Sequence, residues 1–169
     1  MMILSIIVVL LSCLVQGILS NYLGYTYLDL SWFSTIYLLI ALLVLKPYFE
    51  NEKKYLVLLI VFGLVMDIVY TNTFILNTCL FILAYYFTKA FHFFFPYNLF
   101  TVNISNLLAI FLYHIVSFLF LSVLQYDNYT IWVLFRVLSH SILMTVLYTS
   151  VLYTLVHLIQ QKLQLKEVK

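Results

Sequence analysis

Two charged side chains lie inside long apolar runs of the sequence, and they are the clearest candidates for chemistry. Asp67 interrupts the run 55–88, and Arg136 interrupts the run from about residue 130 to residue 159. An ionisable group within an apolar span is costly, so it commonly has a named partner or a function. Because the two charges are opposite, we predict that they pair across two helices or share a polar pocket. Two alternatives remain: Arg136 extends alone to the membrane surface, or the two residues form a proton or substrate site.

The residues around Asp67 indicate how it is positioned. Gly63 precedes it by four residues, so both fall on one face of a helix. A glycine at such a position lets another helix approach closely, which would bring the carboxylate against that neighbour. Asn77, early in the following apolar run, is expected to hydrogen-bond in the same region.

Further polar residues recur at helical spacing within the apolar runs. They form one face of each of three segments, and the simplest interpretation is hydrogen bonding between helices, at about 0.6 kcal/mol per bond. The alternative is a face that lines a cavity or a groove for a partner. These candidates for helix packing or partner binding are Gln16, Asn103, Asn106, His114 and His140.

The sequence offers little for catalysis or metal binding. It contains no G-x-S-x-G, no H-E-x-x-H and no glycine-rich phosphate loop. His114 and His140 are not spaced as a metal pair, and Cys13 and Cys79 lie in apolar runs, where free thiols are expected. We therefore expect a non-enzymatic protein without catalytic residues, metal or cofactor.

Composition defines the elements that must hold these residues. Of 169 residues, 66% are hydrophobic and 8% are charged, whereas soluble domains carry roughly 25% charged residues. This excludes an ordinary soluble enzyme, and the few lysines and arginines exclude a nucleic-acid binder. The abundance of apolar residues excludes disorder. The expected fold class is an all-α integral membrane protein.

The charged and polar interruptions divide the chain into six expected transmembrane helices, which form one membrane domain over 1–161. The first lacks the basic start of a cleaved signal peptide, so we expect it to be retained. The second and fourth have about 16 residues, or roughly 24 Å, less than the ~30 Å of a bilayer core. The helices are expected at 3–20, 30–45, 55–70, 74–89, 99–124 and 131–160, followed by a short basic tail, 162–169.

The lysines set the expected orientation. In the six-helix arrangement all of them fall on the side of the two termini: Lys46, Lys53, Lys54, Lys89, Lys162, Lys166 and Lys169. The opposite loops carry Asp29 and Asp127 instead, with Trp32 and Trp132 nearby. The positive-inside rule then predicts cytoplasmic termini, and it places Asp67 and Arg136 at similar depth near the outer surface.

The segment from Gly63 to Asn77, GLVMDIVYTNTFILN, resembles a known family signature. Its Gly63, Asp67, Leu76 and Asn77 fit the G-L-x-x-D…L-N pattern of the rod-shape-determining MreD family. Gln16 late in the first helix also fits that family, as do the chain length, the six expected helices and the short loops. The specific motif covers this one segment, and the rest of the likeness is one of topology.

The resemblance implies a non-enzymatic subunit of the bacterial cell-elongation complex in the plasma membrane. Such proteins bind the transmembrane helix of an MreC-type protein. They help to couple MreB filaments to a RodA-type glycosyltransferase and its penicillin-binding transpeptidase in peptidoglycan synthesis. The resemblance also implies the fold of the substrate-binding subunits of energy-coupling-factor transporters. Membrane lipid is the other expected partner, and no nucleic-acid partner is expected.

Two other functions stay open at this level. A vitamin-binding subunit of an energy-coupling-factor-type transporter would use the polar faces of the fifth and sixth helices as a pocket. A small channel or proton-coupled carrier would use Asp67, Arg136 and the histidines. The sequence lacks the paired broken helices and the inverted repeat that favour a carrier.

Overall fold

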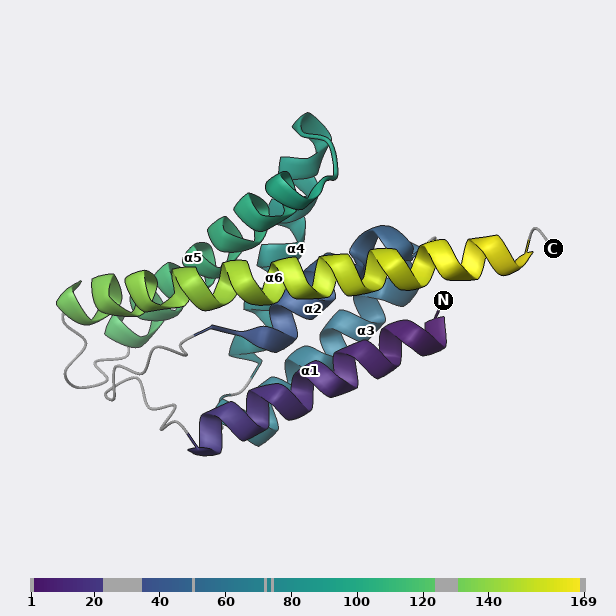
Figure 1. Cartoon of the computed structure of the whole chain (residues 1–169). Coiled ribbons are helices and arrows are strands. Elements are labelled where there is room, and N and C mark those ends of the chain that lie inside the picture. Colours follow the sequence, from purple (N-terminus) through teal and green to yellow (C-terminus); the bar gives the residue numbers. More distant parts are fainter. Residues whose placement is uncertain are drawn as a thin grey trace.

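The computed structural model describes residues 2–22, 35–49, 51–71, 73, 75–123 and 131–167, and their side chains except at 2–4, 19–22 and 162–167. The elements in this part of the chain are helical (Figure 1). They are α1 (Met2–Tyr22), α2 (Tyr37–Leu45), the 3-10 turn η1 (Lys46–Tyr48), α3 (Glu52–Val65), the π-helical turn η2 (Met66–Thr71), α4 (Leu76–Phe94), α5 (Leu99–Val123) and α6 (Ile131–Glu167). An all-α fold is confirmed for these residues.

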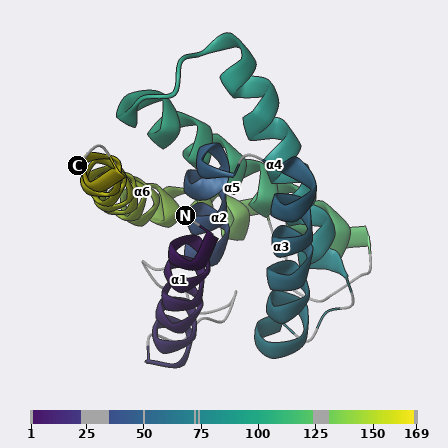
Figure 2. The same ribbon diagram turned by 90° about the vertical axis from the view of Figure 1, so that its right-hand side faces the viewer.

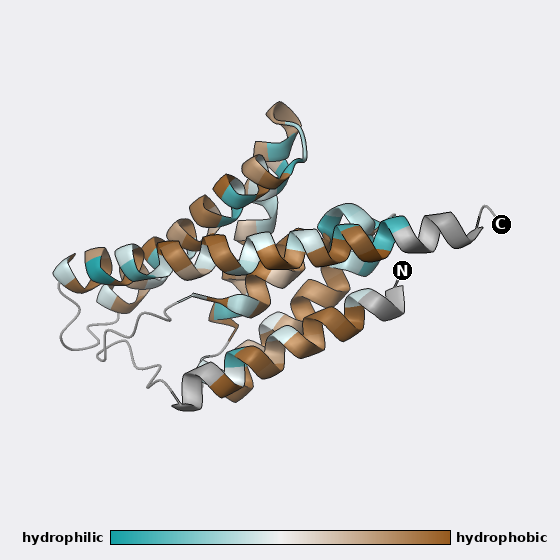
Figure 3. Cartoon of the chain, in the orientation of Figure 1, coloured by the Kyte–Doolittle hydropathy of each residue, from teal (hydrophilic) through white to brown (hydrophobic). Residues whose placement is uncertain are grey.

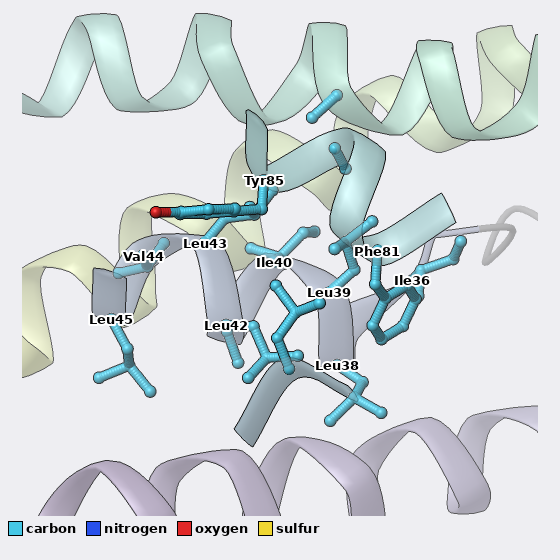
Figure 4. Packing of buried hydrophobic residues seen from close by; sticks show 14 of the residues in the cluster. Ile36, Leu38, Leu39, Ile40, Leu42, Leu43, Val44, Leu45, Phe81 and Tyr85 are labelled. Atoms are coloured by element: carbon cyan, nitrogen blue, oxygen red, sulfur yellow. The ribbon is translucent and has the colours of Figure 1, made fainter. Parts of the chain in front are cut away.

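The short helix α2 occupies the centre of the bundle. Every residue from Ile36 to Leu45 is buried, as expected for a helix that is apolar on all its faces. The helices α1 and α6 pack against it, and Phe81 and Tyr85 of α4 cover another side (Figure 4). At nine residues, α2 is about 14 Å long, less than the ~30 Å of a bilayer core.

The remaining helices form a chain of neighbours around this core. α3 packs against α4, α4 against α5, and α5 against α6. The start of α1 and the end of α6 lie at the same end of the molecule (Figures 1 and 2). Brown, apolar residues cover most of α1, α3 and α6, whereas teal, polar residues are most frequent near helix ends (Figure 3).

Three described helices are long and apolar enough to cross a membrane: Glu52–Thr71, Leu99–Val123 and Ile131–Gln161. Two shorter apolar helices, Ser5–Ile18 and Tyr37–Tyr48, accompany them. Many large apolar side chains of α1, α3, α5 and α6 are exposed, as lipid-facing residues are. These features indicate a membrane protein.

Several helix ends differ from the expected boundaries. The second helix was expected from residue 30, but Thr35 and Ile36 are not helical and α2 begins at Tyr37. α3 begins three residues before the expected start, at Glu52. α4 continues five residues past the expected end at Lys89, to Phe94, because Lys89 binds Glu52 of α3 and so remains part of a packed helix. α6 continues through the expected tail to Glu167. The predicted outer residues Asp29, Trp32 and Asp127 lie outside the described residues.

Candidate functional site

The site begins where α3 and α4 come closest. A Cβ atom added at Gly63 would lie 2.8 Å from Cα of Thr78, a distance that side chains do not tolerate. The absence of a side chain at Gly63 therefore allows the start of α4 to approach α3 directly. This is the close approach expected from the sequence, and it brings Asp67, one turn later, against the first residues of α4.

The Asp67 carboxylate accepts hydrogen bonds from five donors. Its Oδ1 accepts from Thr73 Oγ1 (2.7 Å), Asn77 N (2.8 Å) and Asn77 Nδ2 (3.0 Å). Its Oδ2 accepts from Thr78 N (3.0 Å) and Thr78 Oγ1 (2.8 Å). Asp67 is 1% exposed, so hydrogen bonds from polar neighbours replace the water that it loses on burial.

The start of α4 explains why a carboxylate lies there. The first N–H groups of a helix have no partner within the helix, and the residue before α4, Ile75, has no side chain that accepts from them. Ile75 also adopts a left-handed backbone, with φ of 63°, which is unusual for a β-branched residue. Asp67 takes over as an N-cap supplied from another helix, and the positive end of the α4 dipole favours its negative charge.

A second layer of polar side chains supports this cap. Asn77 Nδ2 lies 2.7 Å from Thr71 Oγ1 and 3.0 Å from Thr73 Oγ1, and the two threonine hydroxyls are 2.7 Å apart. The phenol of Tyr113 on α5 donates to Asn77 Oδ1. We call Asp67, Thr71, Thr73, Asn77 and Thr78 the Asp67 cluster. Through Tyr113 it joins η2, α4 and α5.

The predicted pairing of Asp67 with Arg136 is wrong in this structure. The one ion pair among the described residues joins Lys89 Nζ to Glu52 Oε1 at 2.5 Å. Arg136 is exposed on α6, which packs against α5 and α2, whereas Asp67 follows α3, which packs against α4. The start of α4 already supplies the donors that the carboxylate needs, so a cation is not required to stabilise it.

Gln16 caps a second helix in a similar way. Its Oε1 accepts from Tyr37 N, the first N–H of α2, at 2.8 Å, and its side chain is 1% exposed. Thr35, just before α2, donates to Ser141 O (3.1 Å) and contacts Thr145 Oγ1 (3.2 Å) on α6. The start of α2 is therefore bonded to α1 and fastened to α6.

Tyrosines satisfy the other end of α2. Tyr55 Oη donates to Leu42 O at 3.0 Å, and Tyr97 Oη donates to Val44 O at 2.9 Å. These carbonyls lie in the last turn, where a helix lacks its own donors. Burial raises the pKa of the Tyr97 phenol well above its ordinary value, so this phenol stays protonated and continues to donate.

The other predicted polar residues lie mainly between α5 and α6. Asn103 Nδ2 is 3.0 Å from Ser150 Oγ, and Asn106 Nδ2 is 3.4 Å from Thr149 Oγ1. His114 is buried beside the ring of Tyr113, and His140 is half-buried on α6. The structure thus brings Gly63, Asp67 and Asn77 together, places Gln16, Asn103 and Asn106 at other helix contacts, and leaves the two histidines apart from these sites.

Several residues of these contacts were not predicted. No part in the site was predicted for Thr71, Thr73 and Thr78, although Thr and Asn before an apolar run are a recognised helix-start signal. Tyr113, Tyr55 and Tyr97 carry no local signal, because their partners lie 36, 13 and 53 residues away in the chain.

The chemistry of these clusters is that of helix capping and close packing. Donors surround the Asp67 carboxylate, and its Oδ atoms face no cation in the described part of the chain. In that same part, no three His, Cys, Asp or Glu side chains gather as a metal site. Comparison of the chain with protein-family models, with curated proteins and with solved structures finds no match.

Proposed function

We propose that the chain is a non-enzymatic membrane subunit of the bacterial cell-elongation complex, similar to MreD, which binds an MreC-type protein. The observation that carries the proposal is the meeting of the motif residues. Gly63 allows Thr78 to approach α3 closely. The Asp67 carboxylate accepts from both the backbone N–H and the side-chain amide of Asn77. The spacing that resembles the family therefore has a structural use, which is to join α3 to α4.

The role that fits such a molecule is that of a scaffold which holds other membrane helices. Its polar side chains bond one helix to the next, as Gln16 does for α2 and Asn103 for Ser150. Its outward surface on α1 is apolar, with Leu10, Leu11 and Leu14 exposed. A transmembrane helix can pack on a face of this kind through van der Waals contact.

The proposal includes a location and an orientation. The chain would lie in the bacterial plasma membrane with several passes and with both termini in the cytoplasm. The lysines support this orientation, because in the six-helix arrangement they all fall on the side expected for the two termini. MreB filaments, a RodA-type glycosyltransferase and its transpeptidase would be reached through the MreC-type partner.

The test uses the unaltered protein in the bacterium that encodes it. We expect depletion of the chain to make rod-shaped cells round, and a tagged copy purified from native membranes in mild detergent to bring an MreC-type protein with it. Normal rods after complete deletion, with no MreC-type protein in the purified sample, would contradict the proposal. Retention of a vitamin together with an ATPase module would indicate the transporter subunit instead.

A matched pair of variants separates binding from folding. Leu14→Arg places a charge on the exposed face of α1, where Leu14 is 62% exposed and lies outside the buried core. Leu155→Arg does the same on α6, where Leu155 is 50% exposed. If α1 carries the partner helix, the α1 variant loses the MreC-type protein while the α6 variant keeps it, at equal amounts of folded protein. Retention in both would assign the contact to another face.

A further inference from the structure

The connection between α4 and α5 presents phenylalanine to the surroundings. Phe93 is 83% exposed, Phe94 77%, Phe95 49% and Phe100 73%. We call these four residues the phenylalanine tip. They lie at the end of the α4–α5 hairpin, at the top of Figure 1. A contiguous exposed apolar patch usually marks a contact with a partner or a membrane.

Hydrogen bonds within the hairpin fix the turn that carries the tip. Thr101 N donates to Asn98 Oδ1 (2.9 Å), and Asn98 N donates to Thr101 Oγ1 (3.1 Å), which is a reciprocal helix cap. His92 Nε2 lies 3.0 Å from Ser105 Oγ, and Tyr97 is bonded to Val44 of the central helix. The polar side chains of the turn thus form hydrogen bonds within the protein, and the phenylalanines are exposed.

Positive charge lies beside the tip. Lys89 is one turn before Phe93 on α4 and is bonded to Glu52, the first residue of α3. The next two residues of α3, Lys53 and Lys54, are exposed. Lys46 also lies close enough to act on Glu52 and His92. One carboxylate and four ammonium groups therefore occupy this surface in the described residues, which leaves it cationic.

We propose that the phenylalanine tip inserts into the interfacial layer of an anionic lipid leaflet, with Lys53, Lys54 and Lys89 near the lipid phosphates. Apolar aromatic side chains flanked by lysine are the combination that binds such a layer, and each lysine near an anionic surface adds about 1 kcal/mol, or about fivefold in partitioning. The inference requires a membrane protein but not the elongation-complex function.

The choice of aromatic residue also indicates depth. Tyrosine and tryptophan at membrane interfaces keep a polar group at the headgroup level. Here the tyrosine of the turn, Tyr97, is bonded inward, and phenylalanine, which has no polar group, points outward. The tip should therefore reach the first carbons of the acyl chains rather than stop among the headgroups.

The experiment places tryptophan at the tip of the full-length protein. Phe94→Trp is made in a chain whose two tryptophans carry the changes Trp32→Phe and Trp132→Phe, and the protein is reconstituted in nanodiscs of phosphatidylcholine with phosphatidylglycerol. Brominated lipids with bromine at shallow or deep acyl positions quench nearby tryptophan, and acrylamide quenches tryptophan in water. Leu147→Trp, on the exposed middle of α6, is the lipid-facing reference, and N-acetyltryptophanamide is the aqueous one.

In the Phe94→Trp protein we expect shallow bromine to quench the fluorescence more than deep bromine does, together with protection from acrylamide. In the Leu147→Trp protein we expect the reverse order of the two bromine positions. The shallow quenching of Phe94→Trp should weaken in pure phosphatidylcholine.

Quenching of the Phe94→Trp protein by acrylamide as strong as that of the aqueous reference would overturn the proposal. Absence of quenching by both the brominated lipids and acrylamide would overturn it too, because protein would then cover the tip. If Phe94→Trp does not fold, Phe100→Trp on α5 gives the same measurement.

Discussion

The α1–α2 and α3–α4 pairs each join two helices by a side-chain cap from one helix to the start of the next, but they use different chemistry. In the first pair, Gln16 provides one neutral oxygen to Tyr37 N. In the second, the Asp67 carboxylate accepts from five donors on Thr73, Asn77 and Thr78. Both capping residues are 1% exposed, so burial does not distinguish them.

The difference follows from the donors available at each helix start. α2 lies in an apolar core, where an ionised group with a single bond would keep most of its desolvation penalty. The start of α4 provides hydroxyl and amide groups in addition to its backbone N–H groups, and together they occupy both carboxylate oxygens. A buried charge is therefore kept where a full set of donors surrounds it, and a neutral amide is used elsewhere.

The largest effect should come from removing the charged cap. Asp67→Ala leaves two backbone N–H groups of α4 and several side-chain donors without an acceptor. At about 1–3 kcal/mol for each unsatisfied buried group, we expect a loss of about 3 kcal/mol or more. The free energy of unfolding, measured by denaturant titration in bicelles, would show it.

Two further carboxylate variants make this result specific. Asp67→Asn keeps one acceptor oxygen but turns an amide donor toward other donors, so it should fall between wild type and Asp67→Ala. Glu52→Gln removes an exposed carboxylate that is bonded to Lys89 and Tyr85, and its effect should be small because surface ion pairs are weak. Equal losses at positions 52 and 67 would contradict the interpretation of Asp67 as a cap.

The next largest effect should be a difference in stability cost between alanine substitutions at the glycines of α3 and α1. A Cβ at Gly63 meets the backbone of Thr78 at 2.8 Å, whereas a Cβ at Gly17 meets the phenol oxygen of Tyr70 at 2.9 Å. A phenol at the end of a side chain can move, but a helix backbone can move only with the whole helix. Gly63→Ala should therefore cost about 1–3 kcal/mol, and Gly17→Ala less. Thermal unfolding of the two variants side by side tests the order.

The neutral cap should matter less than the charged one. Gln16→Leu leaves one N–H group of α2 without its acceptor, at about 1–2 kcal/mol, and it keeps most of the side-chain volume. Gln16→Glu restores the acceptor but buries a charge with one donor, so it should be no better than the leucine variant. A glutamate variant as stable as wild type would show that donors at α2 are as plentiful as at α4.

Apolar runs and their interruptions mark most of the helices directly in the sequence, although α2 begins at Tyr37 rather than at the expected residue 30. The expected start at Leu99 and end near residue 124 of the fifth helix agree with α5 within one residue. The close approach of another helix at Gly63, and a hydrogen bond from Asn77 in the region of Asp67, also followed from helical spacing. The identity of that helix as α4 did not.

Long-range pairing was not predictable in the same way. Asp67 and Arg136 were matched because their charges are opposite, yet the packing order of the helices separates α3 from α6. The buried position of α2 depends on which helices surround it, which the sequence of Tyr37–Leu45 does not state. Likewise, nothing near Tyr55 or Tyr97 shows that each phenol satisfies a carbonyl of α2.

A smaller loss of stability is expected from removing the hydrogen bonds at the end of α2. Tyr55→Phe and Tyr97→Phe each remove one phenol that donates to a carbonyl in the last turn of α2. Each should cost about 1 kcal/mol, and the double variant should cost about the sum, because the two phenols have different acceptors. Hydrogen exchange of the α2 amides would locate the loss, and no change there would contradict these bonds.

The smallest effect is expected at Arg136, and it decides between the two explanations of the buried charge. If the donors at the start of α4 stabilise Asp67, Arg136→Gln should change the unfolding free energy by less than about 0.5 kcal/mol, as exposed substitutions usually do. The exchanged double variant, Asp67→Arg with Arg136→Asp, should then be as unstable as Asp67→Arg alone. Recovery of the unfolding free energy in the double variant would require the two charges to be in contact. The carboxylate would then be stabilised by a cation on α6 rather than by the helix start that it caps.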